Sequence, residues 1–233
     1  MPDHSPQSAS LLLAIDTCGP SGSVALGRLS GAGVEILGQA ELAGRSYSAT
    51  LVTAIGDLLA RAGASLDRLR AIVAVNGPGS FTGVRVGLSA VKGLAEGREI
   101  GVVPVSRLEV LAAKSQVPSA ALDAHRGEIY LRVAEPESEG RELLAGAAEL
   151  ASVAPVPARI AVCDEGAATL LHSAWPSAEL VPVPAPTAAD ALALAAPRVV
   201  SGSFADLALL DGHYLRRSDA EIFGDPAARS RCA

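Results

Sequence analysis

Lysine and aromatic residues are scarce in this sequence of 233 residues, and both shortages exclude classes of function. Lys92 and Lys114 are the only lysines, the net charge is −6, and the arginines form no basic stripe. Because affinity for nucleic acid depends heavily on neutralising phosphates, we expect no strong direct binding of RNA or DNA. Aromatic residues make up 3% of the chain against 49% for all hydrophobic residues, so the core is predicted to consist of Ala, Val and Leu.

Long apolar runs and clustered cysteines are also missing. No run approaches the roughly 20 residues that a membrane-spanning helix needs, so no membrane association is expected. Residues 1–10 lack the basic start and the layout of a signal peptide. Cys18, Cys163 and Cys232 are widely scattered, which is typical of a reducing compartment rather than of a disulfide framework or a metal cluster. The sequence therefore predicts a cytoplasmic protein.

The strongest positive signal is the stretch AIVAVNGPGSFTGVRVGLSAVKGLAEG at residues 71–97. A buried strand at 71–75 ends in the turn Asn76-Gly77-Pro78-Gly79, and a helix begins near Ser80. A glycine-rich turn between a strand and a helix presents backbone N–H groups together. Such a turn is suited to holding an anion or another backbone.

The predicted helix after this turn has one face that is almost bare. Small residues recur there at spacings of three and four, at Gly83, Gly87, Ala90, Gly93 and Gly97. Each interior glycine costs about 0.5–1 kcal/mol relative to alanine, so a close neighbour must compensate. The sequence leaves two alternatives for this neighbour: the chain's own sheet, or a helix of a second protein.

The order of predicted elements indicates two similar halves. In the first, strands at 11–16, 23–28 and 34–42 precede a helix from about Ser46, the 71–75 strand, the glycine-striped helix and a strand at 101–105. The second has strands at 119–123, 128–134, 142–144 and 159–162, and helices at 165–173 and 187–200. We expect an α/β fold with mixed sheets and halves at 1–104 and 105–233. The second half is degenerate, with a last helix and tail that could pack back on the first.

Five segments together resemble one family. They are AIDTCGPSGSVAL at 14–26, NGPGSFTGVRVGLSAVKGLA at 76–95, PVSRLEVLA at 104–112, ALDAHRGEIYL at 121–131 and HYLR at 213–216. In order and spacing they are similar to the TsaB (YeaZ) family, the bacterial partner subunit for making N6-threonylcarbamoyladenosine (t6A) at position 37 of tRNA. The resemblance covers about residues 10–217 and implies an actin-like and Hsp70-like (ASKHA) fold of two βββαβαβα halves.

The resemblance also implies a role without catalysis in this chain. A TsaB-like subunit is a scaffold, or pseudoenzyme, that binds and activates the threonylcarbamoyltransferase TsaD, with the ATPase TsaE as a further partner. Without its partner such a chain forms a homodimer. No cofactor is expected to bind tightly, and the question whether a nucleotide binds at the junction of the two subunits is left open. The expected partner interface consists of Leu51, Ile55, Leu58, Leu59, Gly83, Gly87 and Ala90.

Two positions depart from the patterns of related proteins. The catalytic subunit carries an H-x-x-x-H metal pair on the helix after the 101–105 strand, and this chain has Arg107 and Leu111 there. Neither side chain can ligate a metal, so no metal site is predicted. Relatives often begin the first helix with His-Ser or His-Thr, whereas this chain has Tyr47-Ser48, so no role is carried over to that site.

An actin-like ATPase or phosphotransferase that uses Asp16 and Asp123 is the alternative. An Asp at the end of the first strand can order a hydrated Mg²⁺. However, Ala124-His125-Arg126 follows Asp123 in place of a small glycine-led turn, so we expect Asp16 to satisfy turn amides instead. Arg85 could hold an anion or pair with a nearby acid. The vestigial phosphate or anion loop is predicted to comprise Asp16, Thr17, Ser23, Gly77, Gly79, Ser80, Thr82 and Arg85.

Overall fold

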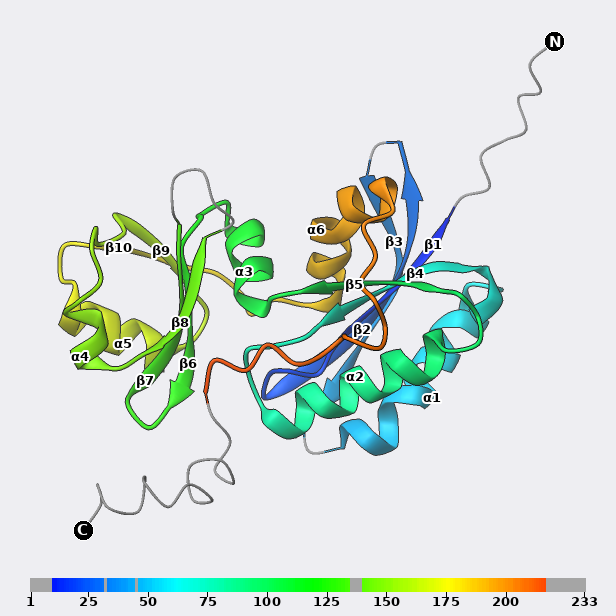
Figure 1. Ribbon diagram of the computed structural model, residues 1–233, viewed down its shortest axis with the longest axis horizontal. Coiled ribbons are helices and arrows are strands. Elements are labelled where there is room, and N and C mark those ends of the chain that lie inside the picture. The colour runs from blue at the N-terminus through cyan, green and yellow to red at the C-terminus, as the bar shows by residue number, and fades with distance from the viewer. Residues whose placement is uncertain (1–9, 32, 45, 135–139, 217–233) are drawn as a thin grey trace.

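The element order βββαβαβα occurs twice along the chain, and each copy builds one sheet (Figure 1). The computed structural model describes residues 10–31, 33–44, 46–134 and 140–216. The first copy comprises β1 (Leu11–Asp16), β2 (Ser21–Ser30), β3 (Gly33–Ala43), α1 (Tyr47–Arg61), β4 (Leu69–Val75), α2 (Phe81–Ala95), β5 (Gly101–Val105) and α3 (Arg107–Ser115). The second comprises β6 (Ala120–His125), β7 (Glu128–Val133), β8 (Arg141–Ala145), α4 (Ala147–Leu150), β9 (Arg159–Val162), α5 (Glu165–Ala174), β10 (Glu179–Pro182) and α6 (Ala188–Ser201).

The two sheets have the same topology. The first has the strand order β3-β2-β1-β4-β5 and the second, read in the same sense, β8-β7-β6-β9-β10. In each sheet the first three strands of the copy are antiparallel, and the last two add in parallel beside the first strand. The pairing confirms the mixed sheets and the duplicated arrangement that the sequence predicted.

Each sheet is covered by helices on both faces, and the last helix of each copy lies on the sheet of the other copy. Helices α1 and α2 pack on one face of the first sheet, while α6 packs on the opposite face. Helix α3 packs on the second sheet against β6, β7 and β9, opposite α5. The central strands are therefore buried on both faces, which is why β1 and β4 are continuous apolar runs rather than alternating ones.

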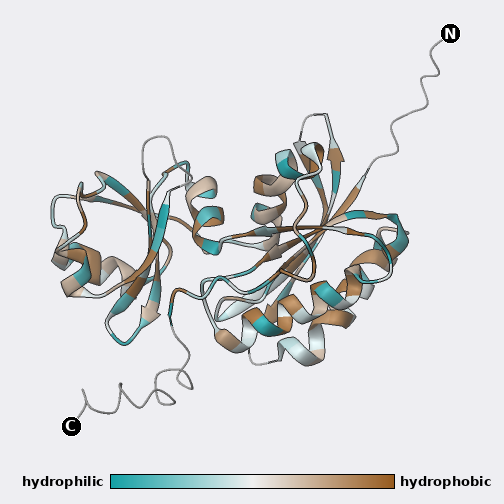
Figure 2. Ribbon diagram, viewed as in Figure 1, coloured by the Kyte–Doolittle hydropathy of each residue, from teal (hydrophilic) through white to brown (hydrophobic). Residues whose placement is uncertain are grey.

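The core is aliphatic, as the composition predicted. Its largest cluster joins the first sheet to α1, α2 and α6, and apolar residues concentrate along the strands of that sheet (Figure 2). A second cluster lies between the second sheet and α5, and a third lies under α3. None of the helices in the described ranges is long and apolar enough to cross a membrane.

Two short elements of the second half were not predicted from the sequence. Helix α4 is one turn long, and β10 is a four-residue strand at the edge of its sheet that ends in Pro182. Proline cannot donate to a sheet ladder and is tolerated at edges, so a strand that ends in proline gives a weak signal in the sequence.

Candidate functional site

The β1–β2 turn and the loop between β4 and α2 lie directly against each other. The amide of Ser80 donates to the carbonyl of Cys18 over 2.8 Å, and Thr17 Oγ1 donates to the carbonyl of Gly83 over 2.7 Å. A Cβ atom on Gly79 would overlap the Cys18 carbonyl, and one on Gly83 would overlap that of Thr17. These two glycines are therefore required because another part of the same backbone approaches them.

Helix α2 begins at this contact. Ser80 is its N-cap, and the hydroxyl oxygen accepts a hydrogen bond from the Gly83 amide over 3.2 Å. No described residue accepts a hydrogen bond from the amides of Phe81 and Thr82 in the first turn of this helix. The N-terminal end of α2 thus keeps free donors, and the helix dipole adds a partial positive charge there.

Asp16 and Asp123 occupy equivalent places in the two sheets. Asp16 Oδ1 accepts a hydrogen bond from the Cys18 amide over 2.8 Å, and Asp123 Oδ1 accepts one from the His125 amide over 2.7 Å. In both cases the acceptor lies two residues before the donor: Asp16 is the last residue of β1, and Asp123 lies two residues before the end of β6. This confirms the expectation that Asp16 satisfies a turn amide.

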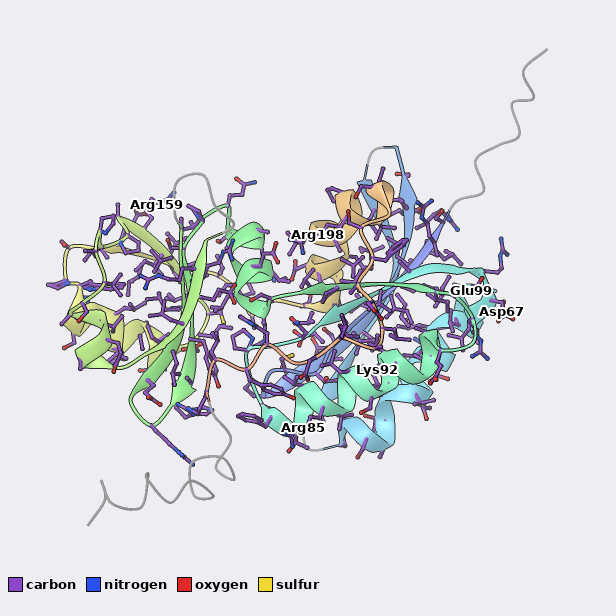
Figure 3. All side chains as sticks on the ribbon, viewed as in Figure 1. Asp67, Arg85, Lys92, Glu99, Arg159 and Arg198 are labelled. Atoms are coloured by element: carbon purple, nitrogen blue, oxygen red, sulfur yellow. The ribbon has the colours of Figure 1, made fainter. Side chains whose placement is uncertain are left out.

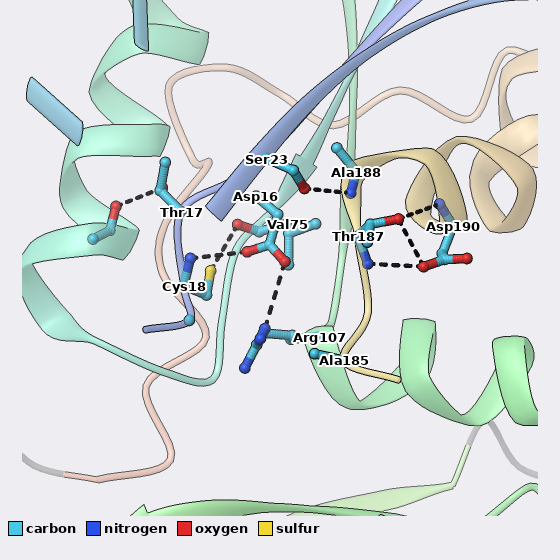
Figure 4. A network of polar contacts seen from close by, with 12 residues as sticks. Asp16, Thr17, Cys18, Ser23, Val75, Arg107, Ala185, Thr187, Ala188 and Asp190 are labelled. Carbon is cyan, nitrogen blue, oxygen red and sulfur yellow. Dashed lines mark hydrogen bonds and ion pairs between the residues drawn. The ribbon is translucent and has the colours of Figure 1, made fainter. Parts of the chain in front are cut away.

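The second contact of Asp16 is an ion pair with Arg107, the first residue of α3 (Figure 4). Arg107 Nε lies 3.5 Å from Asp16 Oδ2, and the side chains are 9% and 2% exposed. Burial by itself lowers the pKa of the guanidinium, but the Asp16 charge outweighs it and raises that pKa above its ordinary value. The carboxylate is therefore neutralised by a cation of the chain itself.

Ser23 and Thr187 bring α6 to the same turn (Figure 4). The hydroxyl oxygen of Ser23 accepts a hydrogen bond from the Ala188 amide over 2.9 Å, and Thr187 forms a capping box with Asp190. Lys114 of α3 pairs with Asp190 over 2.9 Å. Of the predicted anion-loop side chains, Asp16, Thr17 and Ser23 are thus engaged within the chain.

A cavity of about 690 Å³ lies between the two halves at this turn. We call it the central cavity. The first-half copy contributes the β1–β2 turn, the glycine-rich loop, Phe81, Arg85 and Arg107. The second copy contributes Leu122–Arg126, Tyr130, Cys163, Asp164 and Ala185, and Arg216 completes the wall.

Arg85 projects from α2 beside a pair of stacked rings. Phe81 and Tyr214 stack with ring centroids 4.8 Å apart, and the Arg85 guanidinium carbon lies 5.7 Å from the Phe81 centroid. Figure 3 shows Arg85 at the end of α2 nearest the second half. Among the described residues it pairs with no acid, so of the two roles left open for Arg85 the ion pair is not formed, and the guanidinium makes a cation–π contact.

The structure corrects most of the predicted partner interface. The apolar stripe of α1 faces the chain's own sheet, with Leu51, Ile55, Leu58 and Leu59 at 2–6% exposure. Gly83 and Gly87 are likewise buried, because each packs against Thr17. An apolar helical stripe seeks the nearest large apolar surface, and here that surface is the first sheet. Only Ala90 is partly exposed and remains a predicted contact.

A different face of the same two helices is open. Helices α1 and α2 lie side by side, and their outward side carries Ala49, Val52, Gly56, Val86, Ser89 and Gly93. We call this the outer helical face. Val52 is 65% exposed, and a Cβ atom on Gly56 or Gly93 would meet nothing within 4 Å.

Comparison with known proteins identifies the family. Two solved structures from Pseudomonas aeruginosa match almost the whole chain: an uncharacterised protein similar to the peptidase YeaZ (TM-score 0.73, 28% identity, 89% of this chain and 100% of that one) and YeaZ itself (TM-score 0.71, 27% identity, 88% and 100%). The TsaB protein of Haemophilus influenzae is 38% identical over 125 residues, 51% of each chain. The chain belongs to the TsaB (YeaZ) family.

The TsaB family assignment also fixes the fold as actin-like, in agreement with the duplicated topology. The chain spans about half the length of the curated TsaB relatives it matches. A family model described as TsaD, tRNA N6-adenosine threonylcarbamoyltransferase, matches residues 38–153. A protein of that name from Geobacter is 35% identical over 97 residues, 39% of this chain and 28% of that protein.

In this TsaB-family chain the two positions that were compared with an H-x-x-x-H metal pair, Arg107 and Leu111, have other roles. Arg107 contacts Asp16, and Leu111 is fully buried beneath the second sheet. In the described ranges no three His, Cys, Asp or Glu side chains gather as a metal ion would require.

Two groups at the junction of the halves were missed in the sequence. One is Arg107, which the sequence marked only as a lost ligand. The other centres on Glu142 of β8, which accepts hydrogen bonds from Ser106 Oγ over 2.6 Å and contacts His213 Nε2 over 2.9 Å. No local signal identifies either, because their partners lie far away in the sequence.

Proposed function

We propose that this TsaB-family chain is a non-catalytic subunit that binds and activates a TsaD-type threonylcarbamoyltransferase for t6A synthesis on tRNA. The family assignment and the similarity of residues 38–153 to TsaD support this proposal. Two related chains can pair equivalent surfaces about a pseudo-twofold axis, as identical chains do in dimers. The complex acts in the cytoplasm with a TsaE-type ATPase, and the chain forms homodimers without its partner.

The observation that carries the proposal is the pair of glycines on the outer helical face. Gly56 and Gly93 lie inside α1 and α2, have no positive φ angle, and would accommodate a Cβ atom without any contact. Each costs about 0.5–1 kcal/mol relative to alanine, and nothing within the described chain requires it. A closely approaching helix of a partner would require both, with Val52 supplying exposed apolar area.

Catalysis by this chain is disfavoured at the place where an actin-like enzyme holds Mg²⁺ and phosphates. The Asp16 carboxylate is occupied by the Cys18 amide and by the Arg107 guanidinium. A hydrated cation beside Asp16 would have to displace a buried arginine. The residues present therefore do not fit magnesium-bound ATP, and we assign the chemistry to the partner.

The experiment is co-expression with a TsaD-type subunit followed by size-exclusion chromatography. We expect co-elution at micromolar concentration, and its loss in Gly56→Arg and Gly93→Arg. Thr169→Arg, on an exposed position of α5 in the other half, is the matched control and should leave the complex intact. Separate elution of the two wild-type subunits would refute the proposal, as would an unchanged complex in both glycine variants.

The ATPase or phosphotransferase alternative makes a different prediction. It requires ATP turnover by the chain alone and loss of that turnover in Asp16→Ala. Turnover that survives in Asp16→Ala would point to a contaminating enzyme, whereas turnover that disappears in a folded variant would replace the scaffold proposal.

A further inference from the structure

Arg107 presents unused hydrogen-bond donors to the central cavity. Its side chain is 9% exposed and lines the cavity, yet its Nε atom makes no hydrogen bond. No described residue accepts a hydrogen bond from its two terminal nitrogens, and in Figure 4 the far end of the guanidinium points away from Asp16. The Arg107 charge is paired with Asp16, but a guanidinium carries five N–H donors, and a buried donor without an acceptor is costly.

Other positive groups from the first half face the same cavity. The start of α2 forms part of the wall through Ser80 and Phe81, and the amides of Phe81 and of the neighbouring Thr82 have no acceptor among the described residues. Arg85 lines the cavity from the next turn of that helix and pairs with no acid among the described residues. A helix N-terminus flanked by two guanidinium groups is a favourable environment for an oxyanion.

The acids of the cavity lie on the opposite wall and are already engaged. Asp123 accepts the His125 amide and lies 3.0 Å from His125 Nδ1. Asp164 caps α5 by accepting the Ala167 amide over 2.8 Å and also accepts the Asp123 amide over 3.0 Å. Arg126 and Arg216 also line this wall, where Arg216 pairs with Glu128 and donates to the Ala124 carbonyl.

We propose that the central cavity binds a small molecule that carries a phosphate monoester or a carboxylate, without a metal ion. The oxyanion lies between the Arg107 guanidinium and the first turn of α2, with Arg85 at the entrance. The rest of the ligand contacts the apolar part of the wall at Pro78, Leu122 and Tyr130. A volume of about 690 Å³ is in the usual range for sites of small organic ligands and exceeds what a lone phosphate fills.

The positive charge that faces the ligand is supplied by Arg85 and the N-terminal end of α2 rather than by magnesium, while Arg107, already paired with Asp16, contributes hydrogen-bond donors. This distinguishes the proposed site from that of an actin-like ATPase, in which the acid at the end of the first strand serves a metal. It also makes binding independent of divalent ions. The proposal concerns the chain alone, so its outcome is separate from that of partner binding.

Isothermal titration and thermal unfolding of the whole chain test the site, with inorganic phosphate and malonate as probes and sodium chloride at matched ionic strength as reference. We expect saturable binding of at least one probe, a rise in Tm and no change on adding Mg²⁺ or EDTA. Binding of phosphate alone identifies a phosphate ligand, and binding of malonate alone identifies a carboxylate. In both cases the amide resonances of Phe81 and Thr82 should shift.

Variants assign the binding to named residues. Arg107→Gln should weaken binding at least tenfold and Arg85→Gln several-fold, while Arg159→Gln, on the far side of the second half (Figure 3), should bind as wild type. If Arg107→Gln does not fold, the affinity of Arg85→Gln and the shifts of the Phe81 and Thr82 amide resonances test the proposed site instead. Equal effects of chloride, a requirement for Mg²⁺, or undiminished affinity in the folded arginine variants would overturn the proposal.

Discussion

Arg107 Nε lies 3.5 Å from Asp16 Oδ2, and this pair holds the start of α3 to the end of β1. Because α3 packs on the second sheet and β1 is central in the first, this pair of largely buried side chains connects the two halves. The Arg107 amide adds to this connection by donating to the Gly77 carbonyl over 2.6 Å.

Asp16→Ala should destabilise the chain by about 3–5 kcal/mol, because it leaves the Arg107 guanidinium buried without its counter-charge. Chemical denaturation measures the change. Glu179→Ala breaks an exposed pair with Arg159 and should cost less than about 1 kcal/mol. Equal small losses of stability in both variants would show that burial of the Arg107 guanidinium does not require the Asp16 charge.

Two glycines of α2 should respond to alanine with opposite signs. Gly93→Ala should stabilise the chain by about 0.5–1 kcal/mol, since the new Cβ atom meets nothing and the helix gains propensity. Gly83→Ala should destabilise it by about 1–3 kcal/mol, because the Cβ atom would overlap the Thr17 carbonyl. Thermal unfolding of both variants distinguishes them, and a shift of the same sign in both would contradict the described packing of α2.

Glu142 should make the junction of the halves sensitive to acid. Burial raises the pKa of its carboxyl group, but hydrogen bonds from His213 and Ser106 outweigh burial and hold that pKa below its ordinary value of 4.5. The stabilisation is complete above pH 4.5 and is lost as the pH falls through the lower folded value.

Glu142→Gln should therefore reduce stability at neutral pH by about 1.5–3 kcal/mol and flatten the loss of stability below pH 4.5. Denaturation at a series of pH values measures both effects. Glu149→Gln, in an exposed position on α4, is a suitable control. If the pH dependence of stability in Glu142→Gln equals that of the wild type, other carboxylates cause the loss of stability in acid.

Tyr47 should ionise at a higher pH than an ordinary tyrosine and stabilise the folded chain at neutral pH. Its hydroxyl donates to the Gly19 carbonyl over 2.8 Å, and burial, with help from the Asp16 charge, raises its pKa to about 12. Because the unfolded chain ionises near the ordinary value of 10.0, the contribution of Tyr47 is present below pH 10 and is lost toward pH 12.

Tyr47→Phe should cost about 1–2 kcal/mol at pH 7 and show a weaker decline in stability above pH 10. Ultraviolet titration of the phenols gives the ionisation directly. Loss of a phenol that titrates at pH 10 in this variant would contradict the assignment.

The arrangement of strands and helices was largely predictable, whereas the direction of the side chains was not. Buried strands such as 11–16 and 71–75 are apolar on both faces, which is a local property of the sequence. The stripe at Leu51 and Ile55 correctly indicated a helix, but its periodicity does not say whether a sheet or a partner covers it. The structure shows that the sheet does.

The same limit applied to the glycines and to the cavity. Gly83 and Gly93 share one helix and one spacing pattern, yet only Gly83 lies against Thr17. The pairing of Arg107 with Asp16 joins the residues that follow β5 to the end of β1 in the same sheet, so it depends on the strand order of that sheet, which no local pattern specifies. Asp16 itself was correctly predicted to satisfy a turn amide, because its acceptor and donor lie two residues apart.

The exchange of terminal helices between the halves has a consequence for synthesis of the protein. One face of the first sheet is covered by α6, which is formed by residues 188–201. While the ribosome makes the chain, strands β1 to β5 emerge long before this helix, so an apolar surface stays open to water or to chaperones. The N-terminal half therefore cannot complete its core until α6 has been made, and fragments that stop before Ala188 should aggregate when expressed.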